Sequence, residues 1–497
     1  MASLFIHSSF LSSPKPSIPI ISSPTKKPPP PQILHTTVPL AGKTNPAPST
    51  TLQTFWDWLS NKGVVSPKSP SVKPGIVPEG LGLISQKIFS RNEVVVEVPS
   101  KVWINSDTVA ASEIGGLCGG LKPWASIALF LLREKGREDS PWRSYIEIMP
   151  SGNDSTIFWS EEELSELQGT QLLGTTVGVK EYVQSEFLKI EEEIILPNKH
   201  MFPTITLDDF LWAFAMLRSR AFSNLRGQNL VLIPLADLIN HSPGITIDDP
   251  SWEIKGGGLF SRELKFSLRT PIPVKAGDQV KLLYSLWISL QVLIQYDMEK
   301  SNAGLALDYG FIESRSDRNV YTLTLEIPES DPFFGDKLDI AEANGFQETA
   351  YFDIILGRPL PQGLLPYLRL VALEGPDAFL LESIFRNSIW GHLELPISRT
   401  NEELICQVVR DACKTALSNY HTTIEEDEKL MQQGNLDPKL EIAVGVRAGE
   451  KKVLEQIDGI FKERELELDV LEYYQERRLK DLGLVGEQGE IIFWEPK

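Results

Sequence analysis

Two groups of short strand signals flank a long helical stretch, and this alternation limits the possible folds more than any other feature of the chain. The first group ends with Val94–Pro99, a β-branched run that proline stops. The second group contains the apolar runs Leu230–Leu235 and Phe266–Leu268. Between about residues 105 and 210, apolar side chains recur at helical spacing. The pattern predicts an α+β fold in which a helical insert interrupts a β-rich unit.

Capping signals predict where several helices begin. Asp139-Ser140-Pro141 reads as a cap followed by proline in the first turn. Ser160–Glu163 has the form of a capping box, and Asp208–Arg220 has one apolar face. Asp437-Pro438 reads as the N-cap and first turn of a long helix. These signals place helices both inside the insert and near the end of the chain.

After about residue 315 the chain is mostly helical. Its apolar residues stand at helical spacing among Glu, Lys and Arg: Val446, Leu454, Ile457, Phe461, Leu468, Leu471 and Leu479. We therefore predict a β-rich domain over residues 51–315 and a separate all-α domain over residues 316–497, most simply an interaction module.

Residues 1–50 have the composition of a targeting segment and not of a folded domain. They contain no Asp or Glu, many Ser and Thr, several lysines and the run Pro28–Pro31. Such a composition predicts an organelle transit peptide. Mitochondrial presequences favour arginine, which this segment lacks, so the sequence favours the chloroplast. A tail that is merely disordered is the alternative.

Composition excludes several classes of function. The net charge of −19 argues against a general affinity for nucleic-acid or membrane phosphate and makes a basic protein surface the more natural partner. Three cysteines without a C-x-x-C pair suit a reducing compartment, and six histidines, two of them in the tail, do not favour a zinc site. We expect no metal, no nucleic acid and no membrane partner.

Four separated segments hold residues that chemistry could use. In Glu79-Gly80-Leu81-Gly82-Leu83, closely spaced glycines would let the backbone approach a ligand, although a simple turn explains them equally. In Arg218–Phe222, a planar guanidinium fork at a helix end could pair with a carboxylate, or simply be solvated.

The other two segments follow later in the chain. The apolar run Ile233–Leu235 leads into Asp237, Asn240, His241 and Ser242, whose polar groups must find partners. An Asx turn with a satisfied histidine is the alternative. Tyr296 and Tyr309 could both line a channel, or be core tyrosines with one hydrogen bond each.

Together the segments resemble the SET-domain protein methyltransferases, which carry R-S-R-A-F, N-H-S and D-Y-G-F motifs in this order. Three longer stretches resemble the chloroplast subgroup that methylates lysines of the Rubisco large subunit or fructose-bisphosphate aldolase. They are D-L-I-N-H-S, K-S-N-A-G-L-A-L-D-Y-G-F and L-E-Y-Y-Q-E-R-R-L-K-D-L-G-L. The resemblance spans about residues 51–497. It implies a β-rich SET domain with a helical insert, followed by a helical substrate-binding domain.

The resemblance also implies a cofactor, S-adenosylmethionine, and roles for individual residues. The cofactor contacts would be Glu79, Gly80, Leu81, Arg220, Asn240 and His241, with Arg220 on the cofactor's carboxylate. The substrate-side residues would be Asp237, Tyr309, Asn224 and Trp252. Tyr296 matches the tyrosine at the reacting centre. The implied partner is a stromal protein, aldolase or Rubisco.

The chain departs from the subgroup at three places. A segment over residues 281–293 stands just before Tyr296, where the subgroup runs on almost directly; it is either a gene-model artefact or a real insertion. Asn224 replaces a frequent arginine, and Pro250-Ser251-Trp252 replaces a His-Ala pair before an aromatic residue. These two replacements favour aldolase over Rubisco as the better substrate.

Two other functions stay open from the sequence. The chain could be a catalytically weak or silent binding protein whose helical domain grips a stromal partner. It could also methylate histidine, since SET enzymes with this kind of insert can accept that residue.

Overall fold

The computed structural model describes residues 49–65, 70–77, 80–222, 225, 230–241, 252–256, 263–269, 293–294, 300–386 and 388–485. They form two compact units. The N-terminal unit holds the described residues of Leu11–Phe158 and Gly178–Met298, and the C-terminal unit holds those of Trp159–Val177 and Glu299–Lys497. Part of the predicted insert thus belongs to the C-terminal unit. The domain boundary expected at residues 315 and 316 stays a prediction.

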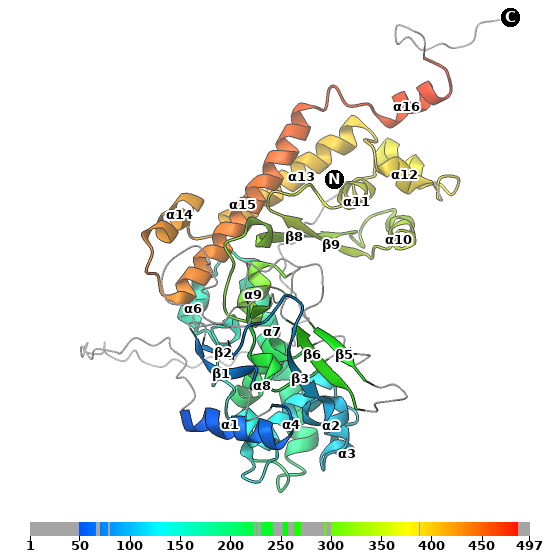
Figure 1. The fold of residues 1–497 in the computed structure, drawn as a ribbon. Helices are drawn as coiled ribbons and strands as arrows, with labels where there is room; N and C mark the ends of the chain where they lie inside the picture. The colour runs from blue at the N-terminus through cyan, green and yellow to red at the C-terminus, as the bar shows by residue number, and fades with distance from the viewer. Residues whose placement is uncertain are drawn as a thin grey trace, which may run out of the picture. The chain divides into compact units, whose positions relative to one another are not determined.

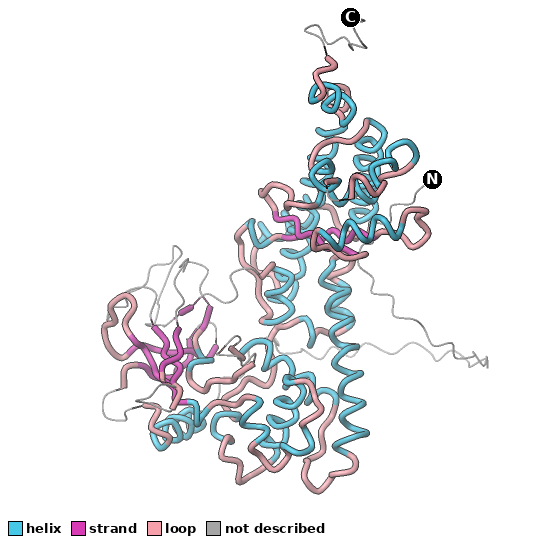
Figure 2. The backbone as a smooth tube through the Cα atoms, turned by 90° about the vertical axis from the view of Figure 1, so that its right-hand side faces the viewer, coloured by secondary structure: helices cyan, strands magenta, loops and turns pink. Residues whose placement is uncertain are grey.

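Short strands make up the β part of the N-terminal unit (Figures 1 and 2). They are β1 (Val72–Val77), β2 (Gly80–Ser85), β3 (Val94–Pro99), β4 (Asn240–His241), β5 (Trp252–Lys255), β6 (Lys265–Arg269) and β7 (Leu293–Ile294). β1 pairs with β2, and β6 lies between β3 and β5, all antiparallel, whereas β4 and β7 are parallel. The strand predicted at Val94–Pro99 is confirmed with the same bounds.

The run Leu230–Leu235 was expected to be a strand, and this expectation is wrong. It makes only isolated bridges, between Leu232 and Ile104 and between Val231 and Phe222. Pro234 offers no N–H to a strand ladder, and Leu235 turns the backbone with a φ of 72°. The chain therefore leaves the extended conformation before a strand can lengthen.

Helices make up much of the remaining described part of the N-terminal unit. They are α1 (Ser49–Asn61), α2 (Ser106–Ala110), α3 (Gly115–Cys118), α4 (Pro123–Gly136), α5 (Arg143–Ile146) and α8 (Leu207–Arg220), with α7 (Gln171–Ile190) crossing the bound between the units and continuing as a π-helical turn over Glu191–Ile195. α4 packs against α8, and every residue of α4 from Ala125 to Glu134 is buried. This pair forms the centre of the unit.

Two predicted helix starts in the insert have different outcomes. The capping box at Ser160 is confirmed: its hydroxyl accepts from the N–H of Glu163 at 3.2 Å, and α6 (Glu161–Ser165) follows. The cap at Asp139–Pro141 is wrong, because α5 begins only at Arg143. The Ser140 hydroxyl accepts from the Trp142 N–H at 3.1 Å, before the helix begins, and donates to the buried Glu134 carboxylate at 2.7 Å.

The C-terminal unit is mainly helical. After α6 and the start of α7 its helices are α9 (Asn302–Asp308), α10 (Phe334–Ala343), α11 (Leu364–Val371), α12 (Ile389–Leu393), α13 (Arg399–Ser418), α14 (Ile424–Gln433), α15 (Pro438–Leu466) and α16 (Tyr474–Asp481). Asp437 accepts from the N–H of Lys439 at the start of α15, as the sequence predicts. α13 runs alongside α15 (Figure 1).

A two-stranded sheet also belongs to this unit, so the prediction that it is all-α omits one element. β8 (Val320–Glu326) and β9 (Thr349–Ile355) pair antiparallel and alternate buried and partly exposed residues. Their inward side chains join α11, α13 and α15 in one apolar core. The α+β fold with a helical C-terminal domain is otherwise confirmed.

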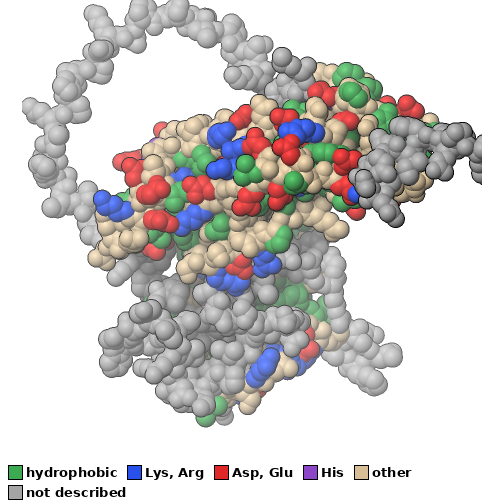
Figure 3. Space-filling view, turned by 90° about the horizontal axis from the view of Figure 1, so that it is seen from above, with side chains coloured by type: hydrophobic (Ala, Val, Ile, Leu, Met, Phe, Trp, Pro, Cys, Tyr) green, Lys and Arg blue, Asp and Glu red, His purple; other side chains and the backbone are tan. Residues whose placement is uncertain are grey.

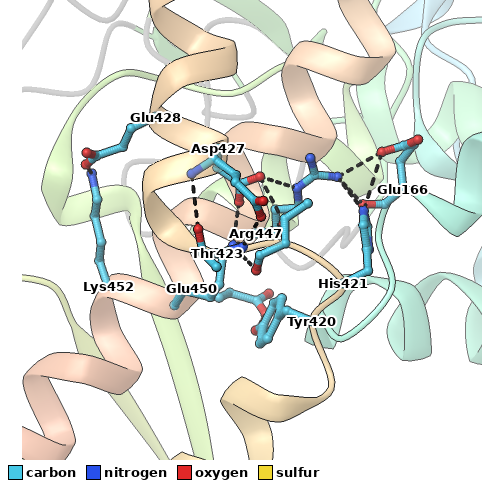
Figure 4. A network of polar contacts seen from close by, with 12 residues as sticks. Glu166, Tyr420, His421, Thr423, Asp427, Glu428, Arg447, Glu450 and Lys452 are labelled. Atoms are coloured by element: carbon cyan, nitrogen blue, oxygen red, sulfur yellow. Dashed lines mark hydrogen bonds and ion pairs between the residues drawn. The ribbon is translucent and has the colours of Figure 1, made fainter.

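A buried polar network connects the insert segment Trp159–Val177, which belongs to the C-terminal unit, to α14 and α15 (Figure 4). The Asp427 carboxylate accepts from Arg447 Nε at 2.7 Å and lies 2.7 Å from Lys451 Nζ. Arg447 Nη1 also donates to Glu166 of the insert at 2.8 Å. Each of these buried charges has an opposite charge beside it, as burial demands.

Exposed charges in the C-terminal unit are interspersed and often paired. Arg410 lies 3.1 Å from Asp458, and Arg386 lies 3.1 Å from Asp336. Figure 3 shows one face of the protein, on which acidic and basic side chains alternate with hydrophobic ones. Among the described residues of this face, acidic side chains therefore do not gather into one patch.

Candidate functional site

Arg220 and Asp237 form a polar cluster where α8 ends. Arg220 is the last residue of α8, and Asp237 lies in the short 3-10 turn η4 (Ala236–Leu238). Arg220 Nη1 donates to the main-chain oxygen of Asp237 at 3.2 Å and to Asp237 Oδ2 at 3.4 Å. The Asp237 side chain is fully buried, whereas that of Arg220 is 16% exposed. Asp237 therefore anchors the guanidinium from its buried side.

Tyr145 completes the cluster from the helical insert. Its hydroxyl donates to Asp237 Oδ2 at 2.8 Å, across 92 positions of the chain. Burial raises the pKa of Tyr145 well above its usual value, and the neighbouring Asp237 carboxylate raises it further. Burial also raises the pKa of Asp237, against the effects of Arg220 and Tyr145. Tyr145 thus remains a neutral hydrogen-bond donor at physiological pH.

Leu235 sets the direction of the segment that carries Asp237 and Asn240. It is fully buried and has a φ of 72°, in a region that leucine rarely adopts. Such strained residues persist only where the surroundings enforce them, and they concentrate at functional sites. The strain aims η4 toward α8 and the next residues toward β2.

Asn240 joins the cluster to the β1–β2 turn. Its side-chain amide donates to the main-chain oxygen of Leu81 on β2 at 3.3 Å. The neighbouring Gly80 has a φ of 110°, which favours glycine, and a Cβ there would meet no atom of the described residues within 4 Å. The main chain at Gly80 is thus open to close approach. Arg220, Asp237, Asn240 and this turn all belong to the N-terminal unit.

β7 brings a later part of the chain to Asn240 and His241. Leu293 pairs with Asn240, and Ile294 pairs with His241, in a parallel ladder. Tyr296 follows two residues after this strand. The backbone just before the proposed catalytic tyrosine is therefore hydrogen-bonded beside the Asn-His pair.

Three of the predicted substrate residues, Trp252, Tyr309 and Asp237, are described each within its own unit. The Trp252 ring stacks on Phe266 at 5.7 Å, within the sheet of β5 and β6. Tyr309 caps the end of α9 in the C-terminal unit, with Lys300 Nζ 5.2 Å from its ring centre. Asp237, expected at the substrate, has its carboxylate turned to Tyr145 and Arg220.

Several predicted features lie outside the described residues. These are Glu79, Asn224, Tyr296 and the segment over residues 281–292. For His241 the described part is its backbone in β4. The roles expected for these residues stay predictions.

Tyr145 is the member of the cluster that sequence reasoning missed. It stands in Trp142-Arg143-Ser144-Tyr145, which matches no motif. A hydrogen bond between residues so far apart leaves no local signature, so no pattern within one sequence could have identified it.

The cluster fits a ligand that combines a carboxylate with a polar body. Among the described residues, Arg220 bonds Asp237 through Nη1, so the remaining donors of its planar fork suit a carboxylate. The open main chain at Gly80 suits a polar body held by peptide groups. S-adenosylmethionine has this composition.

Among the described residues, no three His, Cys, Asp or Glu side chains lie together in a group able to hold a metal ion. Among the same residues, no helix has the length and apolar character needed to cross a membrane.

Comparison with known proteins extends over nearly the whole chain. Residues 328–454 match the family described as Rubisco LSMT substrate-binding. The chloroplastic [fructose-bisphosphate aldolase]-lysine N-methyltransferase of Arabidopsis thaliana is 68% identical, with 90% of each chain covered. The chloroplastic Rubisco large-subunit N-methyltransferase of Nicotiana tabacum is 66% identical, over 90% of this chain and 89% of its own.

A solved structure gives the same result. The SET domain of LSMT bound to lysine and AdoHcy superimposes with a TM-score of 0.83 at 63% identity, covering 89% of this chain and 98% of the other. Sequence and structure agree, so the chain belongs to the SET-domain lysine N-methyltransferases of the chloroplast Rubisco large-subunit and fructose-bisphosphate aldolase type.

Proposed function

We propose that this chain methylates lysine side chains of fructose-bisphosphate aldolase, and of the Rubisco large subunit, in the chloroplast stroma. The chain is a chloroplast protein-lysine N-methyltransferase that uses S-adenosylmethionine. The observation that carries the proposal is 68% identity to an aldolase-lysine methyltransferase over 90% of the chain. Import into isolated chloroplasts followed by fractionation tests the stromal location; recovery in the membrane fraction alone would refute it.

The proposed cofactor site is built mainly from the described cluster. Arg220 would pair with the carboxylate, and Gly80 and Leu81 would offer main-chain groups to the polar body. Asn240, which holds the Leu81 carbonyl, would fix this turn against the cluster. Glu79 and His241 are further proposed contacts. S-adenosylmethionine supplies an activated sulfonium methyl group when it is bound.

At the reacting centre the chain has to align the lysine amine with the methyl group and exclude water from both. It does not have to supply a proton-transfer group. The neutral lysine amine would attack the sulfonium methyl group in line. The N–C bond would form as the C–S bond breaks and S-adenosylhomocysteine leaves, so alignment in a dry channel would lower the barrier. Burial in an apolar channel lowers the pKa of an amine, which favours its neutral form. The Tyr296 hydroxyl would orient the amine, and Tyr309, Asp237, Trp252 and Asn224 would line the substrate side. No dedicated general base is assigned.

Replacement of Tyr296 by phenylalanine tests this assignment. The variant keeps the ring and loses the hydroxyl, so methyl transfer to aldolase should fall by about two to three orders of magnitude. Binding of S-adenosylhomocysteine, measured by calorimetry, should stay close to that of the unmodified protein. Unchanged transfer would remove Tyr296 from the mechanism.

We propose aldolase as the better of the two substrates. Two departures from the subgroup support this choice. Asn224 stands where a substrate-side arginine is frequent, and Pro250-Ser251-Trp252 stands where members expected to accept Rubisco carry His-Ala before an aromatic residue. Radiolabelled methyl incorporation into purified aldolase and purified Rubisco, at matched concentrations, provides the test. Strong labelling of Rubisco with none of aldolase would overturn it.

The alternative, a catalytically weak or silent binding protein, would require the segment over residues 281–292 to displace Tyr296 from the reacting centre. The pairing of Leu293 and Ile294 with Asn240 and His241 supports the active alternative, since the chain returns to the cofactor residues before Tyr296. Cofactor binding without methyl transfer to any stromal protein would favour the silent alternative.

The type of residue that is methylated can be tested separately. Mass spectrometry of labelled stromal proteins distinguishes methylated lysine from methylated histidine.

A further inference from the structure

The buried hydroxyl of Tyr145 has no part in the function proposed above. A single residue, Asp237, nevertheless connects it to Arg220. Its ring is fully buried, and its hydroxyl donates to Asp237 Oδ2 at 2.8 Å. The same carboxylate oxygen accepts from Arg220 Nη1 at 3.4 Å. One oxygen thus links a tyrosine of the insert to the arginine at the end of α8.

The position of Tyr145 is itself fixed by packing. The Phe55 ring of α1 stacks on the Tyr145 ring, with 6.2 Å between centres and 29° between planes. Trp58, on the same helix, donates from its indole to the main-chain oxygen of Pro141 at 2.9 Å. α1 therefore fixes the segment that carries Tyr145, and this packing directs the Tyr145 hydroxyl toward Asp237.

Asp237 transmits this fixed position to Arg220. Arg220 Nη1 donates both to the Asp237 main-chain oxygen and to its carboxylate. Asp237 Oδ1 is buried without a hydrogen-bond partner among the described residues, so the carboxylate is held through Oδ2. Without the Tyr145 hydroxyl, this carboxylate would lose a buried donor and could turn away from the guanidinium.

We infer that Tyr145 is a positioning residue for cofactor binding: through Asp237 it sets the orientation in which Arg220 receives the carboxylate of S-adenosylmethionine. The inference rests on the proposed role of Arg220. It assigns the hydroxyl to the cofactor's amino-acid end and not to its nucleoside end.

Replacement of Tyr145 by phenylalanine, with two ligands, tests the inference. S-adenosylhomocysteine carries the carboxylate, whereas 5′-methylthioadenosine keeps the nucleoside and lacks the amino-acid end. In calorimetry, Tyr145→Phe should raise the Kd of S-adenosylhomocysteine on the order of tenfold, the effect of one misplaced charged hydrogen bond. The Kd of 5′-methylthioadenosine should stay the same. An equal loss for both ligands, or a loss for neither, would overturn the inference.

Tyr420→Phe is the matched control. The Tyr420 hydroxyl also donates to a buried carboxylate at 2.8 Å, that of Glu450, but in the C-terminal unit. Both variants lose a buried tyrosine–carboxylate bond, so both should lower Tm. Only Tyr145→Phe should change the ratio of the two dissociation constants; a similar change in Tyr420→Phe would overturn the inference.

Two further variants keep the result interpretable. Phe55→Leu removes the ring that stacks on Tyr145 but leaves the hydroxyl, so it should give a smaller selective loss even if Tyr145→Phe folds poorly. Arg220→Ala should weaken S-adenosylhomocysteine and spare 5′-methylthioadenosine. If Arg220→Ala has no such effect, the proposed role of Arg220 fails together with the inference. If it has the effect and Tyr145→Phe lacks it, the inference alone fails.

Discussion

Gly80 shows how one backbone conformation can control a site. Its φ of 110° strains any residue with a Cβ, although space for a Cβ exists. We expect Gly80→Ala to weaken binding of S-adenosylhomocysteine by about 1–3 kcal/mol, because the strained turn would shift the Leu81 carbonyl away from Asn240. Calorimetry measures the loss. Gly152→Ala is the control, since Gly152 lacks both the unusual φ and close neighbours. Equal affinities in the two variants would contradict the role of the turn.

At the scale of an element, the Glu450 carboxylate fixes the start of α7 by a hydrogen bond to its first residue. Its Oε2 accepts from the Gln171 N–H at 3.0 Å and from the Tyr420 hydroxyl at 2.8 Å. Burial raises the pKa of Glu450 from 4.5 to about 7. The folded protein therefore binds this proton more tightly than the unfolded chain does. Its stabilising effect is complete below pH 4.5 and is lost as pH rises through 7.

This sign gives a prediction for stability. Between pH 5 and pH 8 the free energy of unfolding should fall by about 2 kcal/mol through Glu450 alone. Glu450→Gln cannot titrate, so its unfolding free energy, measured by urea denaturation, should fall less over the same range. If Glu450→Gln and the unmodified protein show parallel pH profiles, Glu450 is ionised in the folded state throughout.

The segment over residues 281–292, outside the described residues, can be tested as an element too. Its removal leaves Leu293 and Ile294 available to pair with Asn240 and His241. Loop length affects closure only weakly, so the deletion should change the unfolding free energy by less than about 1 kcal/mol. Methyl transfer to aldolase should be equal or higher than in the full chain. A loss of cofactor binding on deletion would show that the segment belongs to the site.

At the scale of the whole molecule, the insert and the C-terminal chain depend on each other. Lys439 Nζ lies 2.8 Å from Glu163, and Arg447 pairs with Glu166. The Gln171 side chain also bonds both the N–H and the carbonyl of Thr322. These partners of Trp159–Val177 all come from sequence after residue 299. The chain is thus not a simple succession of two independent domains.

Truncation tests this dependence. A chain ending at Met298 would leave the buried partners of the insert segment exposed, so we expect little soluble protein. A chain ending at Val485 keeps both units and should bind S-adenosylhomocysteine normally. Soluble yield and calorimetry provide the readouts. A soluble Met298 truncation with full affinity would contradict the expectation.

The sequence determined what depends on neighbouring residues. The β-branched run at Val94–Pro99, the capping box at Ser160 and the Asp437 cap of α15 all form as predicted, because their signals lie within one turn or one strand. The motifs also identified the family, and the 68% identity to the Arabidopsis aldolase-lysine methyltransferase over 90% of the chain confirms it. Arg220 and Asn240 were recognised as a candidate site by such motifs.

Only the tertiary structure decided how distant residues meet. The β8–β9 sheet forms because the alternating faces of Val320–Glu326 and Thr349–Ile355 pack on one core. Tyr145 meets Asp237 across 92 positions, and Glu450 caps α7 across 279. Hydrogen bonds over such separations depend on the packing of whole helices and not on local sequence, so no short pattern encodes them. The proposed cofactor site therefore has an arginine that the sequence revealed and a support that only the fold supplies.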